Sequence, residues 1–130
     1  MPSDKYQAGL AIRHDMFGAG VTDAQINAAS PFLRQMQDIV TENCFGEVWT
    51  RPGLDRRTRS LLTIAMLIGL GRSHEIRIHV KGALSNGATE EELGELLRHA
   101  AVYCGVPAAV DAFINTDAVL REQAATGASA

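Results

Sequence analysis

The stretch "LLTIAMLIGLGRSHEIRIHVKGALSNG", residues 61–87, decides the fold. Its first ten residues are apolar on nearly every side of a helix, a pattern typical of a helix that is covered all round. The apolar run has about half of the roughly 20 residues that a membrane span needs, so we expect a buried helix and no membrane segment. Gly71 is predicted to end this helix, Ser73 to cap the next, and Asn86 with Gly87 to end that one.

On both sides of this stretch, apolar residues recur at spacings of three and four, which predicts helix throughout. Start signals stand at Thr22, at Ser30 before Pro31, at Asp55, at Thr89 with Glu92, and at Pro107. A first helix is expected over about 4–16. Residues 51–53 are expected to end the helix that precedes the apolar run. The sequence therefore predicts an all-α single domain over 1–130, with six or seven helices and a flexible tail from about residue 122.

Charge is distributed unevenly along the chain. The formal net charge is -3, which argues against a protein that binds nucleic acid or an acidic membrane through a broad basic surface. Ten of the 12 basic residues are Arg, and six of these lie within residues 51–77. Because the guanidinium group suits planar recognition of carboxylate or phosphate, this window indicates a small anionic ligand.

The apolar run also bears on assembly. One chain of 130 residues is too small to cover a helix like 61–70 completely, so we expect a homo-oligomer in which subunits cover one another's apolar helices. The N-terminal stretch "MPSDKYQAGLAIRHD" lacks the apolar segment of a secretory signal, so a cytoplasmic protein is expected. Cys44 and Cys104 lie sixty positions apart, so free thiols are expected.

The two histidines of residues 71–87 do not predict a metal site. A zinc-binding HExxH helix needs histidines four residues apart, whereas His74 and His79 are five apart and point about 140° away from each other around the helix. Arg72, Glu75 and His79 do share a face, at steps of three and four. That face suits either a histidine tuned for proton transfer by a carboxylate or a solvated surface with an ordinary ion pair, and the stretch alone leaves both open.

A second group of candidate residues lies in "FGEVWTRPG", residues 45–53. Glu47, Trp49 and Arg51 stand at a predicted helix end and in the loop after it, where functional side chains are commonly mounted. Trp49 is then either the wall of a pocket or a core residue, with Glu47 and Arg51 forming a surface ion pair. Both interpretations fit the sequence.

Taken together, these segments are more specific than any one of them. The stretch "GEVWTRPGLDRRTRSLLT", residues 46–63, followed by His79 and by the helix end at Asn86 and Gly87, resembles the carboxymuconolactone decarboxylase family. The likeness extends over about Lys5 to Phe113. The wider alkyl hydroperoxidase D-like superfamily includes peroxidases with a CxxC motif ahead of the same histidine.

This chain departs from those peroxidases at their redox residues. Arg72 and Glu75 occupy the two cysteine positions, and Ser60 occupies the position of a glutamate that the peroxidases carry. Only His79 is retained. Because a dithiol peroxidase cannot act without its thiolates, the resemblance favours the decarboxylase branch.

The resemblance implies a reaction without a cofactor or a metal. The substrate would be the small dicarboxylate lactone 4-carboxymuconolactone, which loses CO₂ to give 3-oxoadipate enol-lactone in protocatechuate breakdown. Its conjugated lactone carbonyl can accept the electron pair, so the protein must bind a dianion, stabilise charge on the lactone oxygen and deliver a proton. The family is all-α and oligomeric, so a hexamer or a trimer is expected.

The resemblance also implies roles for six residues. His79 would donate a proton or stabilise the lactone oxyanion, and Glu47 would be the second acid/base group. Arg51 would bind a substrate carboxylate and Trp49 would form an apolar wall, with Arg72 and Glu75 orienting His79. Arg56, Arg57 and Arg59 are left open between substrate, acids such as those at 90–92, and a neighbouring subunit.

Two other functions remain open at this point. A member of the family could act on a different small carboxylated lactone, because pocket shape cannot be derived from the sequence. The chain could also be a non-catalytic helical oligomer that binds an anion or a partner protein through its arginine-rich window.

Overall fold

The computed structural model describes residues 2–127, and these form seven α-helices and one π-helix without a β-strand. The all-α fold predicted from the sequence is confirmed. The chain divides into two compact units, an N-terminal unit of Met1–Arg56 and a C-terminal unit of Arg57–Ala130. The single domain expected from the chain length stays a prediction.

The N-terminal unit begins with two helices joined at a glycine. The first, α1 (Asp4–Phe17), starts where the Ser3 hydroxyl accepts a hydrogen bond from the Tyr6 amide. Gly18 then adopts φ 92°, a left-handed conformation that glycine tolerates, and α2 (Ala19–Ala28) follows directly. The predicted start of this helix at Thr22 is wrong. Thr22 lies inside α2, where its buried hydroxyl donates to the Arg13 carbonyl instead of capping a helix end.

The next segment changes its helical period without ending. As predicted, Ser30 caps α3 (Pro31–Ile39) by accepting from the Leu33 amide, with Pro31 in the first turn. From there the chain continues as a π-helix, η1 (Val40–Val48), and its wider turns include the hydrogen bond from the Trp49 amide to the Cys44 carbonyl. The sequence predicts a continuous helix here and gives no sign of the π-helix, a form frequently found at functional sites.

The helices α1 and η1 pack through backbone contact at two glycines. A side chain on Gly9 would collide with the Thr41 carbonyl of η1, and one on Gly46 would collide with the Lys5 carbonyl of α1. This close approach brings Phe45 and Trp49 against Ile12 and Met16, and these four form the buried core of the unit. The two glycines therefore set the distance between the helices that carry this core.

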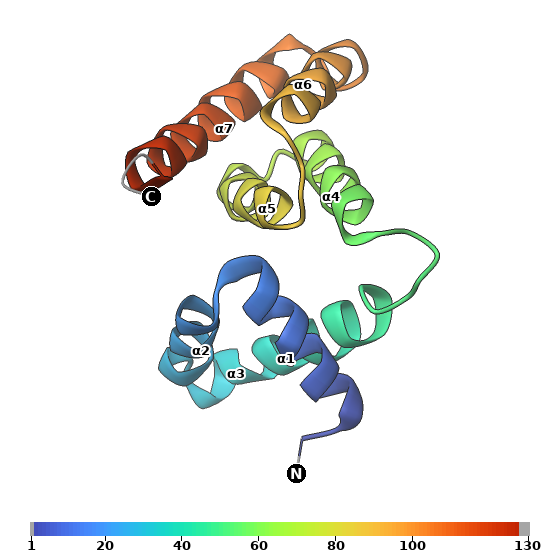
Figure 1. Ribbon diagram of the computed structural model, residues 1–130, viewed down its shortest axis with the longest axis vertical. Coiled ribbons are helices and arrows are strands. Elements are labelled where there is room, and N and C mark those ends of the chain that lie inside the picture. Colours follow the sequence, from blue (N-terminus) through green and yellow to red (C-terminus); the bar gives the residue numbers. More distant parts are fainter. Residues whose placement is uncertain (1, 128–130) are drawn as a thin grey trace. The chain divides into compact units, whose positions relative to one another are not determined.

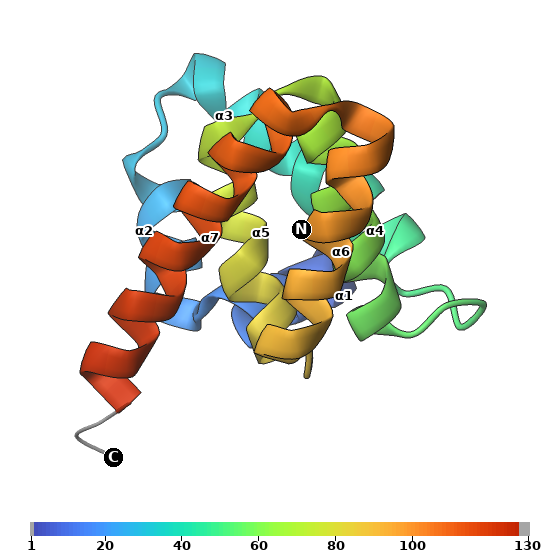
Figure 2. The ribbon, with the colours of Figure 1, turned by 90° about the horizontal axis from the view of Figure 1, so that it is seen from above.

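The C-terminal unit consists of α4 (Arg56–Leu70, whose first residue belongs to the N-terminal unit), α5 (Ser73–Ser85), α6 (Glu90–Cys104) and α7 (Val106–Gly127). Figures 1 and 2 show α7 lying alongside α5 and α6. Its core contains Ile64 and Ile68 of α4, Ile76 and Val80 of α5, Leu93 and Leu97 of α6, and Val119 of α7. Burial of each such aliphatic side chain stabilises the fold by about 1.5–3 kcal/mol.

Most of the predicted helix ends in this unit are confirmed. Gly71 and Gly87 have φ 73° and 94° at the ends of α4 and α5, and Thr89 forms a capping box with Glu92. The predicted cap at Ser73 is wrong, because Arg72 occupies the N-cap position and the Ser73 hydroxyl donates to the Asp111 carboxylate of α7, 2.6 Å away. A tertiary hydrogen bond has replaced the local one.

The apolar run of α4 is less completely buried than the sequence predicts, and the C-terminal segment is helical. In the apolar run of α4, Ile64 and Ile68 are buried but Leu62, Met66 and Leu70 are exposed, so the helix is covered on one side. The helix α7 extends through Gly127, into the segment from about residue 122 for which a flexible tail is predicted. Flexibility there stays a prediction, and residues 128–130 lie outside the described residues.

Substitution of Gly46 tests the backbone contact between α1 and η1. We expect Gly46→Ala to lower the free energy of unfolding by about 3 kcal/mol, because its new methyl group meets main-chain atoms of Lys5 that cannot rotate away. Gly20→Ala in α2 is the matched control, since no atom lies within 4 Å of the added carbon, and it should be neutral or stabilise by up to about 1 kcal/mol. Urea denaturation measures both; equal stability of the two variants would contradict the prediction.

Candidate active site

The six predicted site residues fall into two groups, one in each unit. Arg72, Glu75 and His79 belong to the C-terminal unit, and Glu47, Trp49 and Arg51 belong to the N-terminal unit. The roles that the sequence assigns to these residues stay predictions.

His79 lies on the middle turns of α5 and is half-buried, whereas His74 is exposed. Burial lowers the pKa of His79 below its ordinary value of 6.5, because the charged imidazolium is poorly solvated there. The negative charge of Glu75 acts in the opposite direction and raises that pKa. At neutral pH the free protein therefore holds His79 mainly as the neutral imidazole.

Glu75 and Arg72 lie on the same side of α5 as His79. Arg72 Nη2 donates to Glu75 Oε1 at 3.4 Å, in an exposed ion pair at the helix N-terminus. The shared face predicted from the spacing is thus observed as an arginine–glutamate pair next to a histidine that feels the glutamate's charge. Such a group can hold an anion beside an imidazole and adjust the proton affinity of that imidazole.

The opposite side of α5 is fixed by polar contacts that the sequence reasoning missed. Ser73 donates to Asp111, and Arg77 Nε donates to Asn115 Oδ1 at 2.6 Å. Asn115 is 7% exposed and donates in turn to the Asp111 carbonyl. Arg77 and His79 point roughly opposite ways around the helix. A signal was present in the sequence, since Asp111 and Asn115 are polar residues spaced by four in the apolar first half of α7.

A further missed contact ties the end of α5 to α4. The Asn86 side chain donates to the Ser60 hydroxyl at 2.9 Å, and Ser60 is fully buried. This position serves a hydrogen bond between helices.

In the N-terminal unit, Glu47 is exposed near the end of η1 and pairs with Lys5 of α1 at 3.4 Å. Arg51 follows in the turn after η1, where its side chain is exposed and its amide donates to the Val48 carbonyl. The sequence offered Arg51 as the ion-pair partner of Glu47, and Lys5 is the partner observed. The close approach of α1 and η1, which the sequence does not reveal, explains that contact.

Trp49 satisfies both interpretations of its position. It is 7% exposed and packs against Phe45, with their ring centroids 5.5 Å apart, so it belongs to the core. It also lines an open cavity of about 500 Å³ within the N-terminal unit, together with Ile12, Arg51 and Leu54. An indole wall and a guanidinium at one cavity suit a small ligand with an apolar ring and a carboxylate.

The three doubtful arginines have separate surroundings. Arg56 pairs with Asp15 at 3.1 Å within the N-terminal unit. Arg57 pairs with Glu92 of α6, which agrees with the acidic partners considered for it. Arg59 is half-buried on the second turn of α4.

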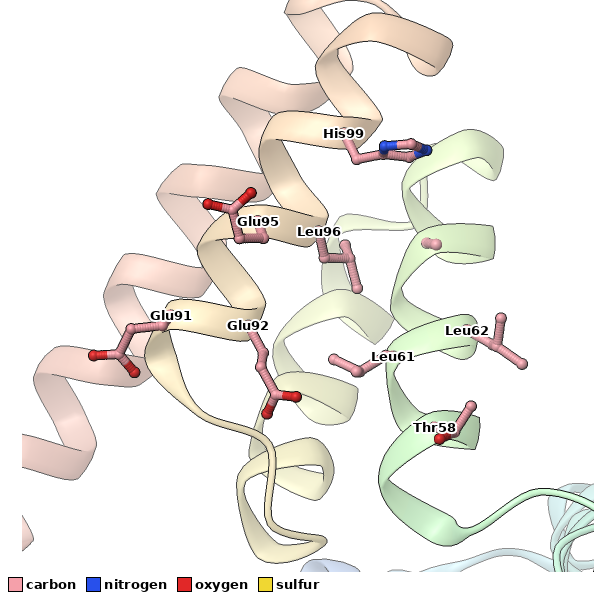
Figure 3. Close-up of a pocket in the computed structure, with 9 residues that line it drawn as sticks. Thr58, Leu61, Leu62, Glu91, Glu92, Glu95, Leu96 and His99 are labelled. Carbon is pink, nitrogen blue, oxygen red and sulfur yellow. The ribbon is translucent and has the colours of Figure 1, made fainter.

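A larger cavity lies elsewhere in the C-terminal unit and contains none of the six predicted residues. It measures about 620 Å³ and is lined by residues of α4 and α6, among them Leu61, Leu62, Glu95, Leu96 and His99. Figure 3 shows Leu61 and Leu96 pointing toward each other, whereas the carboxylates of Glu91 and Glu95 point outward. This surface is mainly apolar and wide open, unlike a pocket built for a small dianion.

Residues 2–127 contain no cluster of three or more His, Cys, Asp or Glu side chains placed to hold a metal ion. Both thiols are free, and burial raises the pKa of Cys44 so that this thiol stays protonated at neutral pH. None of the helices in this part of the chain has the length and apolar character required to cross a membrane.

Comparison with known proteins gives three relatives. The chain is 40% identical over 122 residues to a nitrosuccinic acid decarboxylase of Metarhizium robertsii, covering 94% of this chain and 85% of the relative. It is 37% identical over 118 residues to a 4-carboxymuconolactone decarboxylase of Acinetobacter baylyi, covering 91% and 88%. An uncharacterized 15.0 kDa protein of Paracoccus denitrificans is 36% identical over 84 residues, covering 63% of each chain.

The family assignment rests on a match over most of the chain. Residues 34–118 match the model of the carboxymuconolactone decarboxylase family. That range contains all six predicted site residues, from Glu47 to His79. With two relatives above 30% identity along nearly the whole chain, the protein belongs to the carboxymuconolactone decarboxylase family.

Proposed function

We propose that this protein is a carboxy-lyase that removes CO₂ from a small dicarboxylate without a cofactor, with 4-carboxymuconolactone as its first candidate substrate. The observation that carries the proposal is the half-buried His79 beside Glu75 and Arg72, in a chain 37% identical over 91% of its length to a 4-carboxymuconolactone decarboxylase. With this substrate, the reaction would be a step in the breakdown of protocatechuate. A cytoplasmic location and the lack of a nucleic-acid partner stay predictions.

The reaction can be written with the residues of this chain alone. The bond between the ring carbon and its carboxylate breaks, CO₂ leaves, and the electron pair moves through the ring double bond to the lactone oxygen. One proton then goes to the α-carbon, so the dianion takes up a proton and gives CO₂ and the monoanionic enol-lactone. We assign this proton delivery, or stabilisation of the lactone oxygen, to His79 and the second acid/base role to Glu47.

The lowered pKa of His79 gives substrate binding a role in this scheme. The free protein holds a neutral imidazole, which cannot donate a full proton as an imidazolium does. A bound dianion places negative charge nearby and raises the proton affinity of the imidazole. Substrate binding would therefore favour protonation of His79, and His79 would later deliver this proton to the substrate. Arg51 and the wall formed by Trp49 would hold the second carboxylate and leave the departing one poorly solvated.

A second substrate has specific support, because the relative with 40% identity is named for nitrosuccinic acid. Nitrosuccinate is also a small dicarboxylate, and its nitro group can accept the electron pair as the conjugated lactone does. The two candidates share one requirement, a carboxylate that leaves next to an electron acceptor while another carboxylate is bound. Release of CO₂ from each compound, measured in parallel with purified protein, decides between them. Release from neither would favour a non-catalytic protein that binds an anion or a partner.

Substitution of His79 tests its role in the reaction. We expect His79→Gln to lower kcat by about 10² or more, because a general acid contributes on this order. The matched control is His74→Gln on the same helix, since His74 is exposed, and it should keep full activity. CO₂ release at saturating substrate measures both variants.

The same design applies to Glu47. Glu47→Gln should slow turnover, whereas Lys5→Met removes the observed ion pair but leaves the carboxylate and should have little effect. Full activity in His79→Gln would remove His79 from the mechanism, and full activity in Glu47→Gln would do the same for Glu47.

The pKa of His79 is itself a prediction, measurable by NMR titration of the imidazole. We expect a pKa below 6.5 in the wild type and a lower one still in Glu75→Gln, because Glu75 raises it. Glu95→Gln on α6 is the control and should leave the pKa of His79 unchanged. A higher pKa in Glu75→Gln than in the wild type would contradict the assigned cause.

The same shift makes stability depend on pH with a definite sign. Between the lowered pKa and 6.5, the unfolded chain binds more protons at His79 than the folded chain does, so stability falls as pH falls through this window. His79→Gln lacks this contribution. Its melting temperature should therefore drop less than that of the wild type between pH 7 and pH 5.

We also propose that the protein is a homo-oligomer, with a hexamer or a trimer favoured. The support is the exposed apolar row on α4, where Leu62, Met66 and Leu70 are 42%, 64% and 73% exposed. Light scattering after gel filtration should give the mass of an oligomer, and Met66→Glu should shift it to smaller species because a carboxylate is costly to bury. Gln123→Glu adds the same charge at an exposed position of α7 and should leave the mass unchanged. A monomeric wild type would refute the proposal.

A further inference from the structure

Arg13 of α1 is a buried charge whose hydrogen-bond acceptors are all neutral. It is 5% exposed, and burial lowers its pKa. Its guanidinium donates to the side-chain oxygens of Gln37 at 2.9 Å, Thr41 at 2.8 Å and Gln25 at 3.2 Å. Within residues 2–127, no carboxylate forms an ion pair with it. A buried charge without an opposite charge lowers the stability of the fold, so we looked for a role of Arg13 in the arrangement of the helices.

The three acceptors come from three different segments. Gln25 lies in α2, Gln37 in α3 and Thr41 in η1, so the planar fork of Arg13 joins α1 to every other helical segment of the N-terminal unit. A guanidinium holds several acceptors at fixed angles, which a lysine ammonium on a flexible stem cannot do. Arg13 is tied in addition through its backbone, because the Thr22 hydroxyl donates to its carbonyl.

The contact with Thr41 reaches the first turn of the π-helix. Thr41 is fully buried, and its hydroxyl donates to the Gln37 carbonyl at 2.7 Å while it accepts from Arg13. One guanidinium nitrogen therefore binds both the Thr41 hydroxyl and the Gln37 side chain, on either side of the point where α3 becomes η1. These hydrogen bonds oppose rotation of η1 about its axis at this point.

Rotation of η1 determines where its last residues point. Glu47 lies within η1, and Trp49 follows directly after it. Both also depend on α1, Glu47 through Lys5 and Trp49 through the core with Ile12. Any turn of η1 against α1 would move the carboxylate and the indole together.

We propose that Arg13 is a positioning residue, which locks η1 against α1 and so sets the orientation of Glu47 and Trp49 for the reaction. The catalytic part of this inference rests on the proposed function. The structural part can be measured without any substrate, because Trp49 is the only Trp of the chain and its fluorescence reports on the end of η1.

The test uses Arg13→Met, which keeps the length and apolar stem of the side chain but removes the fork. We expect Trp49 emission to shift to longer wavelength and acrylamide quenching to increase, at temperatures where circular dichroism shows the helices intact. In turnover of 4-carboxymuconolactone, kcat should fall about tenfold or more because Glu47 is misplaced, and KM should rise because the wall formed by Trp49 is displaced. Arg34→Met is the matched control, since Arg34 of α3 pairs with Asp38 and donates to Ile26, and it should leave both readouts unchanged.

Thr41→Val keeps the test decisive if Arg13→Met does not fold. It preserves the side-chain shape, removes the acceptor of Arg13 in η1, and should shift Trp49 emission and quenching in the same direction. An unchanged Trp49 spectrum in the folded variants would overturn the proposal. A lower melting temperature with unchanged spectrum, kcat and KM would also overturn it, because Arg13 would then be structural only. If the wild type decarboxylates neither candidate substrate, the proposed function fails, and fluorescence alone decides whether Arg13 locks η1.

Discussion

Backbone contact between α1 and η1 is the constraint on which the N-terminal unit depends. The absence of side chains at Gly9 and Gly46 lets the two helices approach until main-chain atoms touch. The core around Phe45 and Trp49, the ion pair of Glu47 and the cavity beside Arg51 all follow from that approach. Two positions without a β-carbon thus determine where three candidate site residues lie.

In the C-terminal unit, polar side chains orient the helix that carries the candidate residues. Its candidate residues lie on one side of α5, and the other side is held to α7 by Ser73 and Arg77. The apolar core beneath, including Ile76 and Val80, fixes the depth of α5, but it has little directional preference. Hydrogen bonds to Asp111 and Asn115 supply the direction, because their geometry tolerates little rotation of the helix.

The sequence predicts what depends on neighbouring residues and misses what depends on distant ones. Helix type, the glycine ends at Gly71 and Gly87 and the Thr89 capping box are local, and all are confirmed. The shared face of Arg72, Glu75 and His79 follows from the helical period in the same way. The caps expected at Thr22 and Ser73 are wrong, because each hydroxyl donates to a partner in another helix. The π-helix was missed for the same reason, since its first turn is bound by Arg13 of another helix.

The neutral partners of Arg13 have a consequence for the conditions under which the protein holds its shape. Ion pairs such as that of Arg56 with Asp15 weaken when acid protonates the carboxylate, and salt screens them. Arg13 instead donates to neutral acceptors, the amide oxygens of Gln25 and Gln37 and the hydroxyl of Thr41. These groups do not titrate in this range, so we expect the hydrogen bonds of Arg13 to persist at low pH and at high salt concentration. The hydrogen bonds that we propose to order η1 are therefore independent of the protonation changes that we assign to His79.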